Sequence, residues 1–359
     1  MRIGILNSGG DCPGLNAVIH GVVGAADKLG WGVVGFTDGF EGMLPPARYQ
    51  LLDVNNTMGI QKLGGTILGT TNKGNFGAKV GAGNVMEVPH EIVNAARKTF
   101  DALNLEGLVI IGGDGTLTTA LQLYNMGWPV VGVPKTIDND LQATARTFGF
   151  DSAVTSVVDG LDRLQTTAGS HGRVIVLEVM GRHAGWIALH GGIAGGANAI
   201  LIPEIPFDMD VVCEAVNKRE KDGNNFSLIV VAEGALPEGG EQSFIQTEGA
   251  ASSEYRLGGI GARVAAEIEK RTGKETRSVT LGHLQRGGSP TAFDRILGTW
   301  FGVEAVKLIE KKDFGKMVSY QSASVGAVPI EDAVNQLRLV DPNGEEVNAA
   351  RSVGICMGK

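Results

Sequence analysis

The sequence predicts an α/β fold in which helices cover both faces of a largely parallel sheet. Short apolar runs rich in Val, Ile and Leu recur along the chain, as expected of strands buried on both faces. Several of these runs end in a glycine-rich or acidic turn that leads into a segment with helical spacing, which is typical of doubly wound sheets. With 359 residues, the chain is long enough for two domains or for one elaborated α/β unit.

The N-terminal segment has the pattern of a strand, a glycine-rich turn and a helix. The strand is predicted over Arg2–Asn7, the turn over Ser8–Asn16 and the helix over Ala17–Leu29. Gly9 and Gly10 would let the backbone approach an anion closely at the start of the helix. Taken alone, this turn is weak evidence for a binding site.

The next stretch continues the alternation of strands and helices. A strand is predicted over Trp31–Phe36, a loop over Gly39–Pro46 and an amphipathic helix over Val88–Asn104. Gly64–Phe76 is too rich in Gly, Thr and Asn for a core element. It is a candidate loop over a bound ligand, and an ordinary connecting loop is an equally good interpretation.

A wholly apolar strand over Gly107–Ile111 leads into Gly112–Thr116 and then into a helix over Leu117–Met126. The glycines bring backbone N–H groups to a helix N-terminus, where the helix dipole also favours an anion. Asp114 among such N–H groups is tolerable chiefly when a divalent cation bridges it to phosphates. For a lone turn of this kind, the usual interpretation is a tight turn that caps a helix.

A neighbouring strand over Pro129–Val133 opens directly into the loop Pro134–Asp140. Ligands of open α/β sheets bind at the carboxyl ends of strands, so we expect both loops to face one crevice. Asp138 and Asp140 could divide proton acceptance and metal binding between them. A solvated surface turn is the alternative for these acids, and it is less favoured beside Asp114. We therefore interpret the two loops as a phosphate-transfer site.

The second half of the chain repeats this pattern. A long helix is predicted over Asp151–Ser170, followed by a strand over Arg173–Met180, a turn at Gly181 and Arg182, and a helix over His183–Gly191. Further strands are predicted over Ala199–Pro203, Ser227–Ala232 and Thr276–Gly282, a polar loop over Glu238–Glu254, and helices over Tyr255–Thr272 and Asp294–Glu310, with Trp300 and Phe301 assigned to packing. Polar groups again follow the strand ends, where a second substrate would lie.

Composition narrows the function classes. The 54 glycines are about twice the usual share and indicate many tight turns. A net charge of −8 and an isoelectric point near 5.4 argue against a general nucleic-acid or anionic-membrane surface. The three cysteines form neither a CxxC pair nor a metal-binding spacing. Because the chain has neither a secretory signal pattern nor an apolar run of about 18 residues, we expect a cytoplasmic protein.

Five motifs then occur in one order along nearly the whole chain. They are SGGDCPGLN at 8–16, GGDGT at 112–116, PKTIDND at 134–140, EVMGR at 178–182 and GHLQRGGSP at 282–290. On these motifs the chain resembles the 6-phosphofructokinases. The resemblance implies two doubly wound, Rossmann-like three-layer α/β/α domains. Residues 1–149 plus about 285–335 would bind the phosphoryl donor, and residues 150–284 plus about 336–359 the sugar phosphate.

The resemblance also implies transfer of a phosphoryl group to the C1 hydroxyl of fructose 6-phosphate. Asp138 would be the general base, and Arg182 and Lys135 would be the cations beside the transferring group. Asp114 and Asp140 would hold Mg²⁺. The donor-binding residues implied are Gly9, Lys73, Gly113, Asp114, Gly115 and Thr116.

For the sugar phosphate, the resemblance implies the substrate-binding residues Thr136, Ile137, Asp138, Arg173, Met180, Gly181, Arg182, Glu233, Arg277, His283, Leu284, Gln285 and Arg286. Bidentate guanidinium contacts suit a phosphate dianion. Arg173 and Arg277 would come from a neighbouring subunit, which implies a homo-oligomer, either a dimer or a tetramer. The alternatives are an ordinary surface position for any single arginine and a buried core position for His283.

Two positions give opposite indications about the donor. Gly115 is typical of ATP-using members because it leaves room for the α-phosphate, whereas Lys135 is typical of the pyrophosphate-using branch. A lysine blocks nothing, so we favour ATP, with pyrophosphate as the alternative. Many ATP-using members have an arginine near position 72, where this chain has Asn72 and Lys73. Lys73 would supply a point charge without bidentate geometry.

Two more distant functions are also considered. An NAD kinase-like enzyme would use only the glycine-acid turn, and it leaves Pro134–Asp140 and His283–Pro290 without a role. A catalytically silent nucleotide-binding subunit is disfavoured because Asp138 and Arg182 are both present. The positions that carry effector-binding arginines in regulated bacterial members correspond to His20, Gly24 and Gln165, which predicts weak effector control of that kind.

Overall fold

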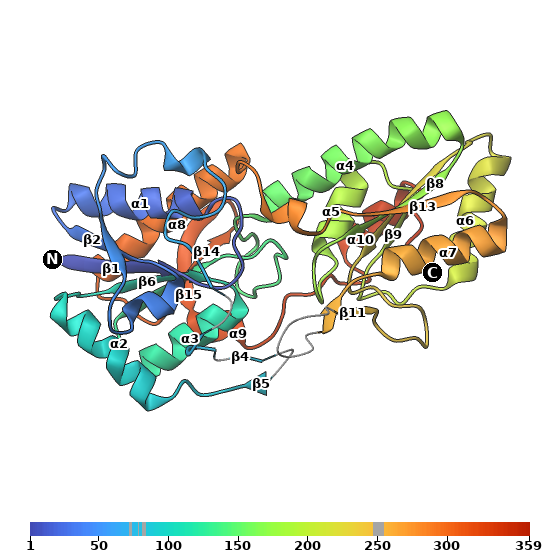
Figure 1. Cartoon of the computed structure of the whole chain (residues 1–359). Helices are drawn as coiled ribbons and strands as arrows, with labels where there is room; N and C mark the ends of the chain where they lie inside the picture. The colour runs from blue at the N-terminus through green and yellow to red at the C-terminus, as the bar shows by residue number, and fades with distance from the viewer. Residues whose placement is uncertain (72–73, 78, 81–83, 247–254) are drawn as a thin grey trace. The chain divides into compact units, whose positions relative to one another are not determined.

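The computed structural model describes residues 1–71, 74–77, 79–80, 84–246 and 255–359. The chain forms two compact units. The first comprises Met1–Ile137, Leu141–Ser152 and Arg286–Leu337, and the second comprises Asp138–Asp140, Ala153–Gln285 and Arg338–Lys359. Each unit is a sheet with helices on its faces (Figure 1), so the predicted α/β fold class is confirmed.

The first unit is built on a seven-stranded sheet in the order β15-β14-β7-β6-β1-β2-β3. Its strands are β1 (Arg2–Asn7), β2 (Gly32–Phe36), β3 (Tyr49–Leu52), β6 (Leu108–Gly112), β7 (Val130–Pro134), β14 (Lys316–Gln321) and β15 (Ser324–Pro329). The inner strands run parallel, and the two edge strands β15 and β3 are antiparallel to their neighbours. Because β1, β6 and β7 are buried on both faces, their continuous apolar runs predicted them correctly.

Helices cover both faces of this sheet (Figure 1). One face packs against α2 (His90–Ala102), α3 (Asp114–Asn125) and α9 (Ile330–Val334), and the other against α1 (Leu15–Lys28) and α8 (Ala292–Glu310). The remaining elements of this unit are the 3₁₀ turns η1 (Gly39–Met43) and η2 (Ile60–Lys62) and the short strands β4 (Lys79–Val80) and β5 (Asn84–Val85).

Glycines let α1 and α8 pack backbone to backbone. A Cβ added at Gly21 of α1 would lie 2.4 Å from the carbonyl oxygen of Thr299. A Cβ added at Gly302 of α8 would lie 2.4 Å from the carbonyl oxygen of Val18. Real Cβ atoms do not approach oxygen so closely, so the packing of these two helices requires glycine at both positions.

The second unit contains a fully parallel four-stranded sheet in the order β13-β8-β10-β9. Its strands are β8 (Val174–Val179), β9 (Ala199–Leu201), β10 (Ser227–Ala232) and β13 (Thr276–Thr280), and β11 (Phe244–Gln246) and β12 (Tyr255–Leu257) form a separate hairpin. Its helices are α4 (Phe150–His171), whose first three residues belong to the first unit, α5 (Trp186–Ala194), α6 (Met209–Lys221), α7 (Ile260–Thr272) and α10 (Glu345–Ser352). The 3₁₀ turn η3 (Gly282–Arg286) follows β13, and its last residue, Arg286, belongs to the first unit. One face of the sheet packs against α6 and α7.

Two predicted elements were wrong around residue 255. Tyr255–Thr272 was predicted as one helix, but its first residues form β12, and α7 begins only at Ile260. The reason is the pair Gly258 and Gly259, whose φ values of 148° and 80° interrupt a right-handed helix. The predicted polar loop before it contains β11, which pairs antiparallel with β12. Residues 247–254 of that loop lie outside the described part of the chain.

Trp300 was wrongly assigned to packing. Phe301 is fully buried, as expected, but Trp300 is 49% exposed. Adjacent residues of a helix point about 100° apart, so Trp300 faces away from the sheet that buries Phe301. The helical spacing could have separated the two aromatic residues.

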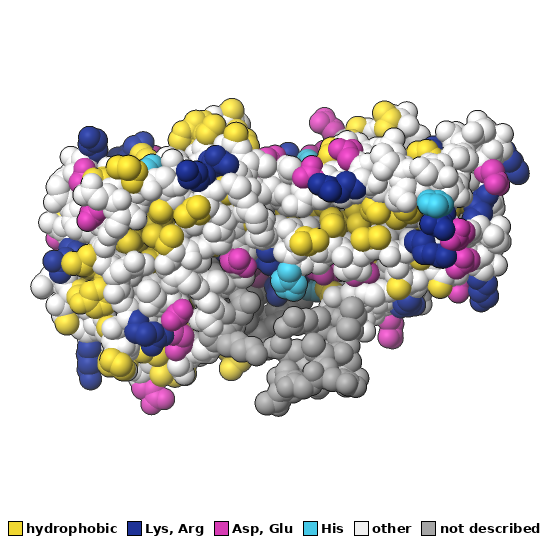
Figure 2. All heavy atoms as spheres, turned by 45° about the horizontal axis from the view of Figure 1, so that its top comes forward, with side chains coloured by type: hydrophobic (Ala, Val, Ile, Leu, Met, Phe, Trp, Pro, Cys, Tyr) yellow, Lys and Arg dark blue, Asp and Glu magenta, His cyan; other side chains and the backbone are white. Residues whose placement is uncertain are grey.

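No helix among the described residues combines the length and the apolar character needed to cross a membrane. On the face drawn in Figure 2, Lys and Arg side chains are interspersed with Asp and Glu side chains.

Two alanine substitutions in α1 test the packing of α1 against α8. Gly21→Ala should destabilise the protein by about 1–3 kcal/mol or more, because the added methyl meets backbone rather than a movable side chain. Gly24→Ala should stabilise it by about 0.5–1 kcal/mol, because no atom lies within 4 Å of the added Cβ and alanine favours the helix. Urea unfolding of both variants measures the difference, and equal stabilities would contradict the close contact.

Candidate functional site

The glycine-acid turn and the acidic loop leave the same edge of the first unit's sheet. β6 and β7 are parallel neighbours, paired from Leu108 with Val130 to Gly112 with Pro134. The backbone N–H of Lys135 donates to the carbonyl of Gly112 at 2.9 Å, which extends the pairing beyond the strands. The two loops therefore start side by side at the carboxyl ends of their strands.

The turn after β1 joins them at this edge. The chain runs from β1 to β2 on one side and returns to β6 on the other, so the sheet has its topological switch point between β1 and β6. Gly9 there has φ of 85°, donates to the carbonyl of Thr71 at 3.0 Å and accepts from Oγ1 of Thr70 at 2.6 Å. Lys135 is 5% exposed, and its Nζ donates to the carbonyl of Gly10.

The N-terminus of α3 offers backbone donors. Gly113 is its N-cap and, being a glycine, has no side chain that could cap this end of the helix. Residues 113–115 are partly exposed, whereas Thr116 is buried against Gly112. Amide N–H groups and the helix dipole at this end suit a phosphate. Asp114 lies in this first helical turn and is partly exposed, so its carboxylate is accessible to a cation held by phosphate oxygens.

The last three residues of the acidic loop, Asp138–Asp140, belong to the second unit. Asp138, Asn139 and Asp140 are 5%, 0% and 8% exposed. Burial and the charge of Arg182 lower the pKa of His183, while the charge of Asp138 opposes that shift. Asp138 is thus close enough to the turn after β8 to interact electrostatically with it.

Glu233, directly after β10, lies against the same turn. Its Oε1 accepts from the backbone N–H of Arg182 at 3.1 Å. Burial raises the pKa of Glu233 to about 7, with further upward contributions from the charges of Asp138 and Glu178. A Cβ added at Gly234 would lie 1.9 Å from the carbonyl oxygen of Arg182, so the two strand-end turns are in backbone contact. The second unit therefore brings Asp138, Arg182 and Glu233 together.

The last motif follows β13, beside the turn after β8. The order of strands places the switch point of this sheet between β8 and β13. The buried side chain of Gln285 accepts from the N–H of Met180 at 3.4 Å and donates to the carbonyl of Gly282 at 3.1 Å. His283 and Leu284 are exposed beside it. Gln285 thus fixes the loop that presents His283, a role that its place in the motif did not reveal.

Arg173 and Arg277 lie at the opposite end of this sheet. Arg173 precedes β8, and Arg277 near the start of β13 is paired with Ile175 near the start of β8. Both donate to Oε1 of Glu275, at 2.8 and 2.6 Å. A six-residue strand spans roughly 20 Å, so these arginines are about that far from Met180 at its other end. Within one chain they do not join Arg182 and Glu233.

Three other predicted residues belong to the first unit. Nη1 of Arg286 donates to the carbonyl of Asp11 at 3.1 Å and would lie 2.8 Å from a Cβ added at Gly10. The carbonyl of Thr136 accepts from Oγ1 of Thr147 at 2.7 Å. Ile137 is 1% exposed, so its side chain is part of the core and only its backbone can serve a ligand. Lys73 lies outside the described residues.

Sequence reasoning missed two groups that shape the site. Thr70, which hydrogen-bonds Gly9, lies in the loop that was identified only by its composition. Arg338 hydrogen-bonds the carbonyls of Asn139 and Asp140, although it lies in the tail that gave no sequence signal. A hydrogen bond across about 200 residues has no local pattern that could predict it.

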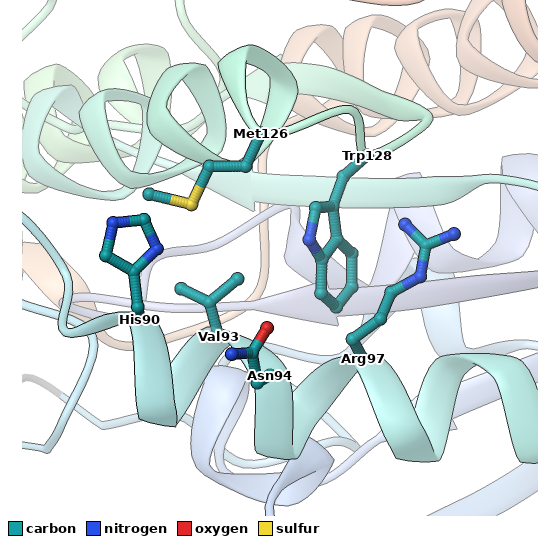
Figure 3. A pocket seen from close by; sticks show the side chains of 6 residues that line it. All are labelled: His90, Val93, Asn94, Arg97, Met126 and Trp128. Atoms are coloured by element: carbon teal, nitrogen blue, oxygen red, sulfur yellow. The ribbon is translucent and has the colours of Figure 1, made fainter.

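A surface cavity of about 490 Å³ lies away from these loops. Figure 3 shows its lining side chains, which are His90, Val93, Asn94, Arg97, Met126 and Trp128. Trp128 precedes β7, so the cavity lies toward the amino end of that strand rather than at its carboxyl end. Arg97 lies over the rings of Phe100 and Trp128, 5.3 Å from each centroid.

No cluster of three or more His, Cys, Asp or Glu side chains in the described ranges has metal-binding geometry. In phosphoryl-transfer enzymes, Mg²⁺ is held by one or two carboxylates together with phosphate oxygens and water, so such a site needs no cluster of this kind. Asp114 in the open first turn of α3 fits such a site. Cys12 is not a reactive thiol, because burial raises its pKa to about 12.

The chain is similar to a protein-family model and to several named enzymes. A family model described as phosphofructokinase matches residues 2–309. The chain is 51% identical to the ATP-dependent 6-phosphofructokinase of Chloroflexus aurantiacus, over 99% of this chain and 98% of that protein. It is 47% identical to the ATP-dependent 6-phosphofructokinase of Mycobacterium leprae, over 99% of this chain and 100% of that protein.

Solved structures share the fold. Phosphofructokinase from Saccharomyces cerevisiae superposes with a TM-score of 0.80 at 30% identity, covering 93% of this chain but only 45% of the yeast chain. This chain thus spans less than half of that relative. Pyrophosphate-dependent phosphofructokinase from Nitrosospira multiformis superposes with a TM-score of 0.80 at 22% identity, over 100% of this chain and 92% of that one. At that identity the likeness concerns the fold alone.

The raised pKa of Glu233 predicts a pH-dependent stability. A carboxyl group whose pKa is higher in the folded state than its ordinary 4.5 stabilises the fold below pH 4.5, and this contribution is lost as the pH rises through about 7. The free energy of unfolding should therefore fall from about pH 5 to about pH 8, and Glu233→Gln should reduce that fall. Urea titrations across this range measure it, with the exposed Glu241→Gln as the control. An unchanged slope in Glu233→Gln would contradict the raised pKa.

Proposed function

The chain belongs to the phosphofructokinase family, and we propose that it transfers the γ-phosphoryl group of ATP to the C1 hydroxyl of fructose 6-phosphate, giving fructose 1,6-bisphosphate in glycolysis. The observation that carries the proposal is the 47–51% identity, over nearly full length, to enzymes named ATP-dependent 6-phosphofructokinase. The two switch-point sites support it, because they provide one binding region for a phosphoryl donor and one for an acceptor.

The first unit is the donor-binding part of this proposal. Backbone N–H groups at Gly9 and at residues 113–116 would receive the phosphates of ATP. Gly115 adds no side chain at the partly exposed start of α3. The Nζ of Lys135 is already directed to the carbonyl of Gly10, so it adds positive charge without blocking a nucleotide. Lys135 is also the one residue that favours pyrophosphate as an alternative donor.

The proposed general base Asp138 and the proposed catalytic cation Arg182 both lie in the second unit. Asp138 is buried, which suits a carboxylate that accepts the proton of the C1 hydroxyl. Arg182 would stabilise the negative charge that spreads over the transferring group. Asp114 and Asp140 would hold Mg²⁺, which neutralises charge on the phosphates when bound. The sugar phosphate would be bound by Met180, Gly181, Glu233, His283, Leu284 and Arg286.

The positions of Arg173 and Arg277 support a homo-oligomer. Within the second unit, roughly 20 Å of sheet separates them from Met180. They can serve a sugar phosphate only in the site of another copy, so each site would be completed by a neighbouring subunit. Subunits that complete one another's sites in this way form a closed symmetric assembly, which would be either a dimer or a tetramer.

A donor comparison tests the function directly. The purified protein should phosphorylate fructose 6-phosphate with Mg-ATP and run far more slowly with pyrophosphate; faster turnover with pyrophosphate would overturn the choice of donor. Asp138→Ser should lower kcat by about 10²–10⁴-fold, because the proton acceptor is lost, while fructose 6-phosphate binding measured by calorimetry stays nearly intact. The exposed Asp162→Ser on α4 is the matched control and should keep full turnover.

Mixed oligomers test the shared site. Arg277→Ala and Asp138→Ser should each be nearly inactive alone. When the two variants are co-expressed and the mixed dimer is purified through two tags, it should show about half of the wild-type turnover, because one of its two sites is intact. Arg182→Ala mixed with Asp138→Ser should stay inactive, since both residues come from one chain. Equal recovery, or equal failure, of the two mixtures would contradict the assignment of Arg277 to the partner subunit.

A further inference from the structure

The C-terminal segment holds the loop that carries Asp138 through one arginine. The backbone N–H of Arg338 donates to the carbonyl of Asp140 at 2.8 Å, and its Nη1 donates to the carbonyl of Asn139 at 3.2 Å. Asn139 is fully buried with φ of 52°, in the left-handed region that a non-glycine residue occupies only when its surroundings hold it there. Arg338 thus bonds two successive carbonyls of a strained turn directly after Asp138.

Arg338 is itself fixed by Trp186 at the start of α5. The guanidinium carbon lies 4.2 Å from the centroid of the Trp186 ring, within the range of a cation–π interaction. Nε1 of the same ring donates to the carbonyl of Arg338 at 2.8 Å. Trp186 is only 6% exposed, so the ring is a rigid support for the arginine. Both the backbone and the side chain of Arg338 are therefore tied to one residue.

The start of α5 is anchored to the same segment a second time. The carboxylate of Glu204 accepts from the N–H of Gly185, at 2.9 and 3.1 Å to its two oxygens, and from the N–H of Val340 at 2.9 Å. Gly185 is the N-cap of α5 and follows Arg182 by three residues. Glu204 therefore joins the turn that carries Arg182 to the chain that follows Arg338.

We propose that Arg338 is a positioning residue that fixes the loop of Asp138 relative to the turn of Arg182. The inference rests on the proposed function, which places the proton acceptor on one of these segments and the phosphoryl-stabilising cation on the other. Proton transfer depends steeply on placement, since a shift of about 1 Å can cost on the order of 100-fold in rate. Arg338 makes this contribution without touching either substrate.

Substitutions of the side chain separate this role from simple packing. Arg338→Met keeps an apolar stem against Trp186 and leaves both backbone hydrogen bonds intact, but it removes the donor to Asn139. It should lower kcat by about 10- to 100-fold while the KM values for ATP and fructose 6-phosphate stay within about threefold. Arg338→Lys retains a cationic donor and should recover part of the lost kcat.

Arg351→Met is the matched control. Arg351 belongs to the same C-terminal segment, and its Nη1 donates to the carbonyl of Pro342 at 2.9 Å rather than to the loop of Asp138. It should leave kcat unchanged. If Arg338→Met retains the kcat of Arg351→Met, or if KM rises as much as kcat falls, the positioning role is overturned. Melting curves of the variants show whether each one folds.

Should Arg338→Met fail to fold, Trp186→Phe carries the test. It keeps an aromatic face under the guanidinium and removes the indole donor to Arg338 together with one of the two fused rings, so kcat should fall about threefold or more at constant KM. If Trp186→Phe keeps the wild-type kcat, the inference is overturned. If the wild-type protein shows no turnover with ATP and fructose 6-phosphate, the proposed function is refuted, and this inference with it. If the wild-type protein is active and Arg338→Met has the same kcat, only this inference is refuted.

Discussion

β6 and β7 pair in parallel over five consecutive residues, and both strands are buried on their two faces. This register brings Gly112 level with Pro134, so the glycine turn and the acidic loop begin side by side. A slip of one residue would exchange the side chains of the two faces and disrupt their fit with the neighbours packed on each face. The places where the glycine turn and the loop of Asp138 leave the sheet are thus set by the packing of these two strands.

Close backbone contacts then shape the turns at the strand ends. Gly112 lies against Thr116 at the start of α3, and Gly234 lies against the carbonyl of Arg182, so neither position has room for a side chain. In the second unit, the same compactness buries Glu233 beside Asp138, and burial raises its pKa to about 7. Clustered carboxylates of this kind cost stability and are common where a protein has to move protons. Arg338 fits this arrangement, because it holds a strained turn that local structure alone would not maintain.

The sequence predicted the elements that depend on local pattern. Apolar runs located β6 and β7, and the glycines and acids directly after them located both loops of the candidate site. Helical spacing extended α7 through Gly258 and Gly259, because periodicity counts apolar positions and overlooks two residues with positive φ. The contacts of Arg338 and Gln285 were not predictable, since each depends on segments that meet only in the folded chain. The distance between Arg173 and Arg182 also needed the strand register, which the sequence does not state.

A crystal structure with a non-hydrolysable ATP analogue and fructose 6-phosphate tests the central claim most directly. The account predicts the analogue's phosphates on the N–H groups at the start of α3, with the carboxylate of Asp138 within hydrogen-bond reach of the C1 hydroxyl. The same crystal should show the 6-phosphate bound by Arg173 and Arg277 of another copy of the chain. An analogue bound away from α3, or a C1 hydroxyl that faces a group other than Asp138, would contradict the account.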